Sequence, residues 1–134
     1  MDDNQALTDA DYQALASFRY ALRQFTTFSE SKATEAGLTP RQHQALLAIR
    51  AAHEPATVGF VAERLIMKPH SATGLIDRLE ASGLVSRHSS AQDRRLSVLE
   101  LTPRAHALLF SLSATHREEI RRLKPLLTEL LLKL

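Results

Sequence analysis

The stretch SATGLIDRLEASGLVSRHSSAQDRRLSVLELT, residues 71–102, decides the fold of this chain. Its first part carries an apolar stripe at helical spacing, which consists of Ala72, Ile76 and Leu79. Gly83 stands where a helix C-terminus favours glycine, and two short apolar runs follow at residues 84–88 and 95–101. The polar segment between these runs is longer than a two-residue turn. The stretch therefore predicts a helix followed by a β-hairpin with an extended tip.

A second short helix is predicted immediately before this one. The segment TVGFVAERLIM, residues 57–67, begins with Thr57, which is a good N-cap residue. Its inward side is predicted to consist of Val61, Leu65 and Ile66. Pro69 marks the start of the next helix, so only a few residues separate the two. Two short amphipathic helices joined this closely are typical of a helix-turn-helix.

Further helices are predicted on both sides of this unit. Apolar side chains recur at helical spacing over residues 11–32. Thr39, Pro40 and Gln42 supply an N-cap, a first-turn proline and a capping box for a helix that is broken near Pro55. The buried side of that helix is predicted to be Leu46, Leu47 and Ile49.

The last predicted helix begins with the same cap-plus-proline pattern, at Thr102 and Pro103. Pro125 is expected to kink or end it, because proline lacks the N–H that a helix interior uses. The tail LLTELLLKL, residues 126–134, carries more leucines than one water-exposed helix face accommodates. This tail is therefore expected to pack against another surface.

The order of four helices, a hairpin and a final helix resembles the winged-helix domain of the MarR family of bacterial transcription regulators. The matching segments are GLTPRQHQALLAI, TVGFVAERL, SATGLIDRLEASGLV and DRRLSVLELT, and the likeness runs nearly end to end. Phe60 departs from the family pattern, which often has glutamate there, and Ala105 departs from a frequent glycine. Each segment alone is weak, but their order and spacing together are specific.

The resemblance implies a mainly α fold with a small β-hairpin wing. A single domain over residues 1–134 is expected, in which residues 38–102 form the winged helix-turn-helix DNA-binding lobe. N- and C-terminal dimerisation helices are expected at residues 11–35 and 104–134. The implied function is sequence-specific DNA binding, most often as a repressor that a small, often aromatic ligand releases.

The residues predicted to contact DNA lie on the second helix of the helix-turn-helix, the recognition helix, and on the wing. Small polar side chains let a helix approach base edges in the major groove, and arginines suit the negative potential of the minor groove. Asp93 is expected to orient an arginine, and Lys68 leaves helix amides free for a phosphate. The predicted set is Lys68, Pro69, His70, Ser71, Thr73, Gly74, Arg78, Arg87, Asp93, Arg94 and Arg95.

Two of these assignments have alternatives. Taken alone, the wing tip also fits a solvated turn with a local ion pair, and the surrounding architecture is what favours DNA contact. Arg87 fits an exposed strand arginine almost as well as a phosphate contact. Asp77, which phosphates would repel, is predicted to be structural.

The outer helices predict a homodimer, because their apolar residues have no obvious partner within a winged helix alone. The predicted interface consists of Leu15, Phe18, Leu22, Phe25, Leu126, Leu127, Leu130, Leu131 and Leu134. A two-fold dimer predicts a pseudo-palindromic operator with half-sites about one helical turn apart. The alternative is that both termini pack on their own domain.

Other classes of function have little support in the sequence. The net charge is +2 and there is no cysteine, which excludes disulfides and thiolate metal ligands. The six histidines are dispersed, so no metal or cofactor is predicted, although His43 and His116 could line a pocket between the helices and the lobe. No catalytic motif is found, so the chain is not expected to be an enzyme.

The N-terminus is acidic and lacks the pattern of a signal peptide, so the cytoplasm is the expected compartment and no membrane partner is predicted. Two rival functions stay open from the sequence. One is a winged-helix module that binds protein, and the other is a small-molecule-binding protein without operator binding.

Overall fold

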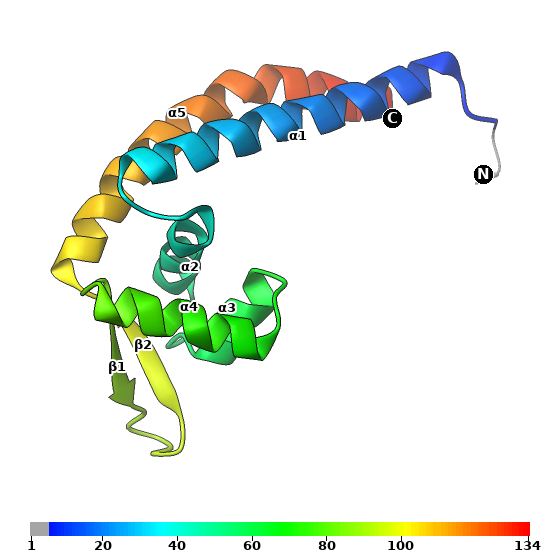
Figure 1. Cartoon of the computed structure of the whole chain (residues 1–134). Helices are drawn as coiled ribbons and strands as arrows, with labels where there is room; N and C mark the ends of the chain where they lie inside the picture. The colour runs from blue at the N-terminus through cyan, green and yellow to red at the C-terminus, as the bar shows by residue number, and fades with distance from the viewer. Residues whose placement is uncertain (1–5) are drawn as a thin grey trace.

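The computed structural model describes residues 6–134, which form five helices and one β-hairpin. In chain order these are α1 (Asp9–Glu35), α2 (Pro40–Ala51), α3 (Val58–Arg64), α4 (Pro69–Ala81), β1 (Val85–Ser89), β2 (Ser97–Leu101) and α5 (Pro103–Lys133). In Figure 1, α1 and α5 run side by side as a helical arm, and the other elements form a winged-helix lobe beside one end of it. Residues 1–5 of the predicted domain lie outside the described residues.

One apolar core holds the lobe together. It takes buried side chains from α2, α3, α4, both strands and the first turns of α5. The largest side chains enclosed in it are Leu46, Val61, Ile76 and Leu79. Ala72 is also fully buried, so the predicted inward stripe of α4 is confirmed. The core fixes α4 against α3 by its inner side and leaves its outer side free.

Two apolar residues that were predicted to be buried are exposed. Leu47 is 46% exposed, because it lies about 100° around α2 from the buried Leu46. Ile66 is 92% exposed, because it follows the last turn of α3 instead of belonging to its inward face. Leu65, which was also predicted to lie on the inward side of α3, is half-buried against the core.

The ends of α1, α3 and α4 share one backbone motif, in which the residue just past the helix adopts a positive φ. Gly37 and Gly83 have φ values of 80° and 73°, and Ile66 has 52° at the end of α3. The Met67 N–H donates to Ala62 O at 2.9 Å and the Ile66 N–H to Glu63 O at 3.2 Å, as in a Schellman motif. A β-branched residue is strained in this conformation. The motif turns the chain sharply from α3 into α4, which makes the predicted helix-turn-helix.

The hairpin is antiparallel, with Val85 opposite Leu101 and Ser89 opposite Ser97. Both strands begin later than predicted, so the tip is longer and spans residues 90–96. The base of the hairpin is anchored where α4 ends and α5 begins. There the Thr102 hydroxyl donates to Gly83 O at 2.7 Å, and the Arg104 guanidinium donates to Ser82 O at 2.7 Å.

The helical arm contains an uninterrupted α5. Pro125 lies inside this helix, so of the two expected outcomes, a kink or an end, the end is wrong. Leu123 and Leu130 are buried on the two sides of the proline, and packing along α1 offsets the hydrogen bond that proline removes. α5 therefore connects the base of the wing to the far end of the arm.

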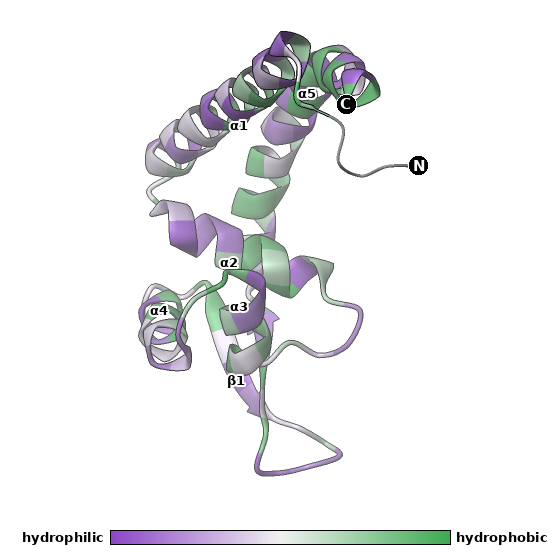
Figure 2. Ribbon diagram, turned by 90° about the vertical axis from the view of Figure 1, so that its right-hand side faces the viewer, coloured by the Kyte–Doolittle hydropathy of each residue, from purple (hydrophilic) through white to green (hydrophobic). Residues whose placement is uncertain are grey.

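The residues predicted for a dimer interface differ in exposure. Leu130 is 5% exposed within its own chain, so it has little surface left for a partner. The half-buried members are Phe18, Phe25 and Leu127, and the exposed ones are Leu15, Leu22, Leu126, Leu131 and Leu134. Further exposed apolar side chains on the arm are Tyr12, Tyr20, Phe110, Ile120 and Leu132. Figure 2 shows the apolar C-terminal end of α5, beside α1.

Candidate nucleic-acid interface

The N-terminus of α4 has no side-chain cap. Its N-cap residue is Lys68, which makes no capping hydrogen bond, and Pro69 follows at the first helical position. By contrast, Thr8 and Thr39 close complete capping boxes at α1 and α2, as predicted for Thr39. Free amides at a helix N-terminus attract anions, because the helix dipole is positive there. The N-terminus of α4, which the sequence predicted to contact DNA, can therefore bind a phosphate through its free amides.

The outer side of α4 is exposed, as the predicted contacts require. His70 and Ser71 point away from the core, and Arg78 lies two turns further along. The Thr73 hydroxyl donates to Pro69 O at 3.1 Å, so this group is already engaged in its own helix. At Gly74, an added Cβ would meet only the Arg78 guanidinium at 3.6 Å. The protein's own packing does not require glycine at this position. The missing side chain lets another molecule approach the backbone of α4 closely.

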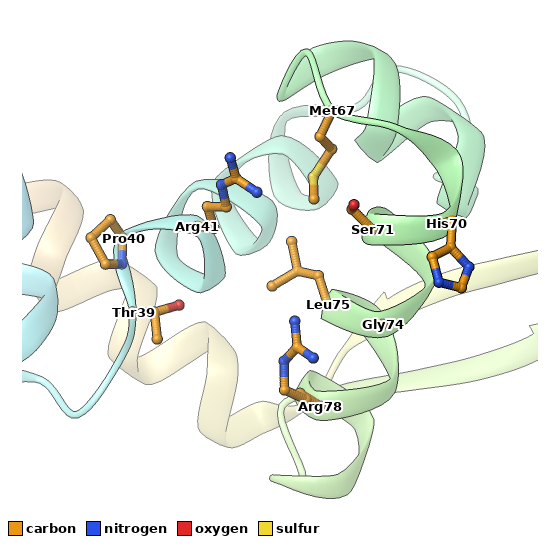
Figure 3. Close-up of a pocket in the computed structure, with 9 residues that line it drawn as sticks. All are labelled: Thr39, Pro40, Arg41, Met67, His70, Ser71, Gly74, Leu75 and Arg78. Carbon is orange, nitrogen blue, oxygen red and sulfur yellow. The ribbon is translucent and has the colours of Figure 1, made fainter.

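A groove of about 710 Å³ runs between the start of α2 and the outer side of α4. Figure 3 shows Arg41 of α2 and Arg78 of α4 on two sides of it, with Leu75 between them. Neither guanidinium belongs to an ion pair within residues 6–134. Two unpaired arginines at one groove give it a positive potential that suits a phosphate.

Sequence reasoning missed Arg41. The residue occupies the first turn of α2, where a basic side chain opposes the helix dipole. An arginine in an unfavourable helix position was a usable signal for a binding role. Its distance in sequence from the recognition helix concealed that the two face the same groove.

The wing tip holds one tethered and one free arginine. Arg95 donates from its backbone N–H to the Asp93 carboxylate at 3.0 Å and from Nε at 3.2 Å. The side-chain bond to Arg95, more than the backbone bond, lowers the pKa of Asp93. Arg95 remains 91% exposed, and Arg94 joins no ion pair within the described chain. Asp93 thus orients Arg95 as predicted, while both guanidinium groups stay open to solvent.

Arg87 is engaged inside the lobe. Its guanidinium donates to Asp77 at 2.8 Å and to Glu80 at 3.1 Å, and both acceptors belong to α4. The hydrogen bond to Asp77 is the main cause of the raised Arg87 pKa. These bonds disagree with the predicted phosphate contact and agree with the structural role predicted for Asp77. Arg87 holds β1 against the recognition helix. These bonds fix the position of the base of the wing relative to α4.

Other kinds of site find little support in the described residues. Residues 6–134 hold no cluster of three or more His, Asp or Glu side chains that could bind a metal ion. In the same range, no helix has the length and apolar character needed to span a bilayer.

Comparisons with known proteins agree with this geometry. A sequence model described as the MarR family matches residues 36–96, which cover most of the winged-helix lobe. The HTH-type transcriptional repressor MdtR of Bacillus subtilis (strain 168) is 32% identical over 93 residues, which are 69% of this chain and 59% of that protein. The uncharacterized HTH-type transcriptional regulator YfiV of the same strain is 36% identical over 76 residues, 57% of this chain and 48% of that protein. The chain thus spans only about half to three fifths of the length of these relatives.

The fold extends the match beyond the lobe. A mutant of Staphylococcus aureus MepR, solved bound to an oligodeoxyribonucleotide, superposes with a TM-score of 0.68. The match has 22% sequence identity and covers 90% of this chain and 84% of that one. The mainly helical architecture with a two-stranded wing is therefore the winged helix-turn-helix fold of these proteins. With the lobe matched in sequence and the fold matched over most of its length, this chain is similar to the MarR family of regulators and shares its winged helix-turn-helix fold.

Proposed function

We propose that the protein is a homodimeric transcription regulator that binds operator DNA and represses by blocking a promoter. The observation that carries this proposal is the groove between α2 and α4, which holds the unpaired Arg41 and Arg78 beside the uncapped N-terminus of α4. The wing adds the exposed Arg94 and Arg95. The relative MdtR is named a repressor, and the MepR mutant was solved with an oligodeoxyribonucleotide, which supports the same role here.

The geometry suits a recognition helix laid into the major groove. His70 and Ser71 are exposed near the N-terminus of α4, the part of such a helix that reaches base edges. Arg41 and Arg78 would bind phosphates along the groove wall, which positions the helix without reading sequence. The wing arginines would enter the adjacent minor groove, where the negative potential is strong. We leave Arg87 out of this contact set, because its guanidinium already binds Asp77 and Glu80.

Dimerisation is the second part of the proposal. The arm exposes leucines and aromatic residues along both α1 and α5, and so many exposed apolar side chains favour an interface there. A second copy of the same arm would cover it through two-fold symmetry. Two recognition helices would then face one side of the DNA, which requires an inverted repeat with half-sites about ten base pairs apart.

Release by a small aromatic ligand is the third part. The arm carries a groove of about 730 Å³ whose lining includes Tyr20, Phe28 and Arg23. Aromatic and guanidinium groups together suit an aromatic carboxylate. Such a ligand weakens DNA binding only if it prefers the arrangement of lobes that does not fit the operator. We expect benzoate at millimolar concentration to lower operator affinity severalfold in a fluorescence anisotropy titration, and Arg23→Ala to reduce this effect.

Arg41 provides a prediction for the interface that sequence reasoning missed. We expect Arg41→Ala to weaken operator binding about tenfold, which is the loss of roughly one charged phosphate contact. The slope of log Kd against log salt should fall by about one. Arg50→Ala, at the opposite end of the same helix, is the matched control and should change neither quantity. Equal effects of the two substitutions would remove Arg41 from the interface.

The proposal as a whole is tested by selecting duplexes from a random DNA pool with the purified protein at about 0.15 M salt, where non-specific phosphate binding is weak. Recovery of an inverted repeat supports the dimeric regulator and yields the operator. Recovery of no enriched sequence contradicts operator binding. In that case, salt-insensitive binding to a protein would favour the interaction module, and tight ligand binding without an effect on DNA would favour the small-molecule-binding protein.

A further inference from the structure

Two buried histidines meet where the winged-helix lobe joins the helical arm. His43 lies on α2 and His116 lies near the middle of α5, and their ring centroids are 4.8 Å apart. The two residues are 4% and 8% exposed, and they are the buried polar or charged side chains of the described chain. DNA binding as proposed above uses neither of them. Two titratable rings in contact at the junction of two substructures need an explanation of their own.

His116 has a complete set of hydrogen bonds that connects it to the arm. Its Nδ1–H donates to Leu112 O at 2.7 Å, and its Nε2 lies 2.8 Å from the Ser29 hydroxyl of α1. The rings of Phe25 and Phe28 pack edge-on against it at 6.0 and 5.5 Å between centroids. In the neutral ring, the Ser29 hydroxyl donates to Nε2. His116 is thus a fixed part of the α1–α5 contact.

His43 is not satisfied in this way. Its Nδ1 is buried without a hydrogen-bond partner among the described residues. The neutral tautomer with its proton on Nε2 leaves Nδ1 as an unpaired acceptor, whereas protonation would create an unpaired buried donor with a positive charge. Burial, and then the neighbouring His116, lower the pKa of His43. The folded protein therefore favours the neutral ring.

The surroundings offer no charge that would compensate a proton on His43. On α1, Lys32 pairs with Glu35, and on α5, Glu119 pairs with Arg122. The charged residues of α2 itself, Arg41 and Arg50, are exposed cations. Within residues 6–134, no carboxylate forms an ion pair with either histidine.

We propose that His43 and His116 form an acid-sensitive joint that positions the winged-helix lobe on the arm, and that protonation of His43 at low pH loosens the joint. His43 and His116 are positioning residues here, since they touch no DNA. In a dimer, the joint sets the orientation of each recognition helix relative to its symmetry mate. Loosening it would spread the two helices over many orientations and reduce the fraction that fits the operator. This last consequence rests on the proposed function, whereas the joint itself does not.

The lowered pKa of His43 determines whether acid strengthens or weakens the joint. A histidine whose pKa is lower in the joined state than in the open state binds a proton more readily when the joint opens. The joint is therefore stable above the ordinary histidine pKa of about 6.5 and weakens as the pH falls below it. The largest possible effect is about tenfold per pH unit in the equilibrium between the joined and open states.

The first readout uses no DNA. Urea unfolding of the full chain is measured at about pH 7.5 and pH 5.5, at one protein concentration because a dimer's stability depends on it. The unfolding equilibrium constant of the wild type should rise severalfold, up to about tenfold, more on acidification than that of His43→Leu, which cannot carry a charge. His43→Gln serves if the leucine variant folds poorly, and the exposed His106→Leu should keep the wild-type response. A wild-type response in both His43 variants would overturn the proposal.

The second readout is operator affinity over the same pH range. Wild-type affinity should fall by up to about tenfold for each protomer, and His43→Leu should lose less than about threefold in all. If the proposed function is wrong, the protein binds no operator at pH 7.5. The unfolding experiment then tests the joint without DNA. Operator binding that is strong and independent of pH would refute the joint's effect on DNA while leaving the regulator intact.

Discussion

Replacing Arg94 and Arg95 together by alanine is expected to weaken operator binding about a hundredfold, since each lost charged contact accounts for about a tenfold change. Both guanidinium groups are exposed at the wing tip, and Arg95 is held in place by Asp93. Their removal should also lower the slope of log Kd against log salt by about two, because two fewer counterions are released. Fluorescence anisotropy at several salt concentrations measures both quantities.

The matched control for this variant is Arg117→Ala with Arg121→Ala. These two arginines are exposed on α5, so the control removes the same charge from the arm. It should leave the salt slope unchanged, which separates a local contact from a general loss of positive charge. A wing variant with the wild-type slope would show that the tip is a solvated turn with a local ion pair, the alternative that the sequence left open.

The second large effect is expected at the C-terminal end of the arm. Leu131→Asp with Leu134→Asp should convert the dimer to a monomer at micromolar concentration and lower operator affinity at least about a thousandfold, because one half-site contributes little without the other. The two leucines are 60% and 59% exposed, so charges there cost little within one chain. Across a dimer interface, the same charges would be buried without partners.

This double substitution is preferable to removing the whole segment after Pro125. Truncation would also delete Leu130, which is buried in its own chain, and a loss of folding would then imitate a loss of dimerisation. Sedimentation gives the oligomeric state, and circular dichroism reports whether the helices persist. Ser111→Asp places one such negative charge on α5 away from the leucine tail and should remain dimeric. A dimeric leucine variant would place the interface elsewhere on the arm.

Much of the fold could be predicted from local patterns because the relevant interactions are local. The capping box of Thr39 and Gln42 and the positive φ of Gly83 involve residues close in sequence. Ile66 was misplaced because its positive φ, which turns it outward, occurs where glycine is the usual residue. Leu47 was misplaced because three apolar residues in a short helix do not reveal which side meets the core.

The candidate site was harder to predict, because its assignments depend on distant pairs. Arg87 follows Asp77 by ten residues, and only the packing of β1 on α4 brings their side chains within 2.8 Å. Arg41 reaches the recognition surface through the packing of α2 against α4. The wing tip is different, since Asp93 and Arg95 are two residues apart and their bond could be predicted from sequence.

The continuity of α5 makes it a lever. Its 31 residues span about 46 Å, with the hairpin joined at one end and the leucine tail at the other. A tilt of about 5° at the tail moves the opposite end by about 4 Å, which exceeds the axial rise of about 3.4 Å between successive base pairs. In the proposed dimer on DNA, a small rotation between two copies of the arm would thus be enough to move each wing by about one base-pair step.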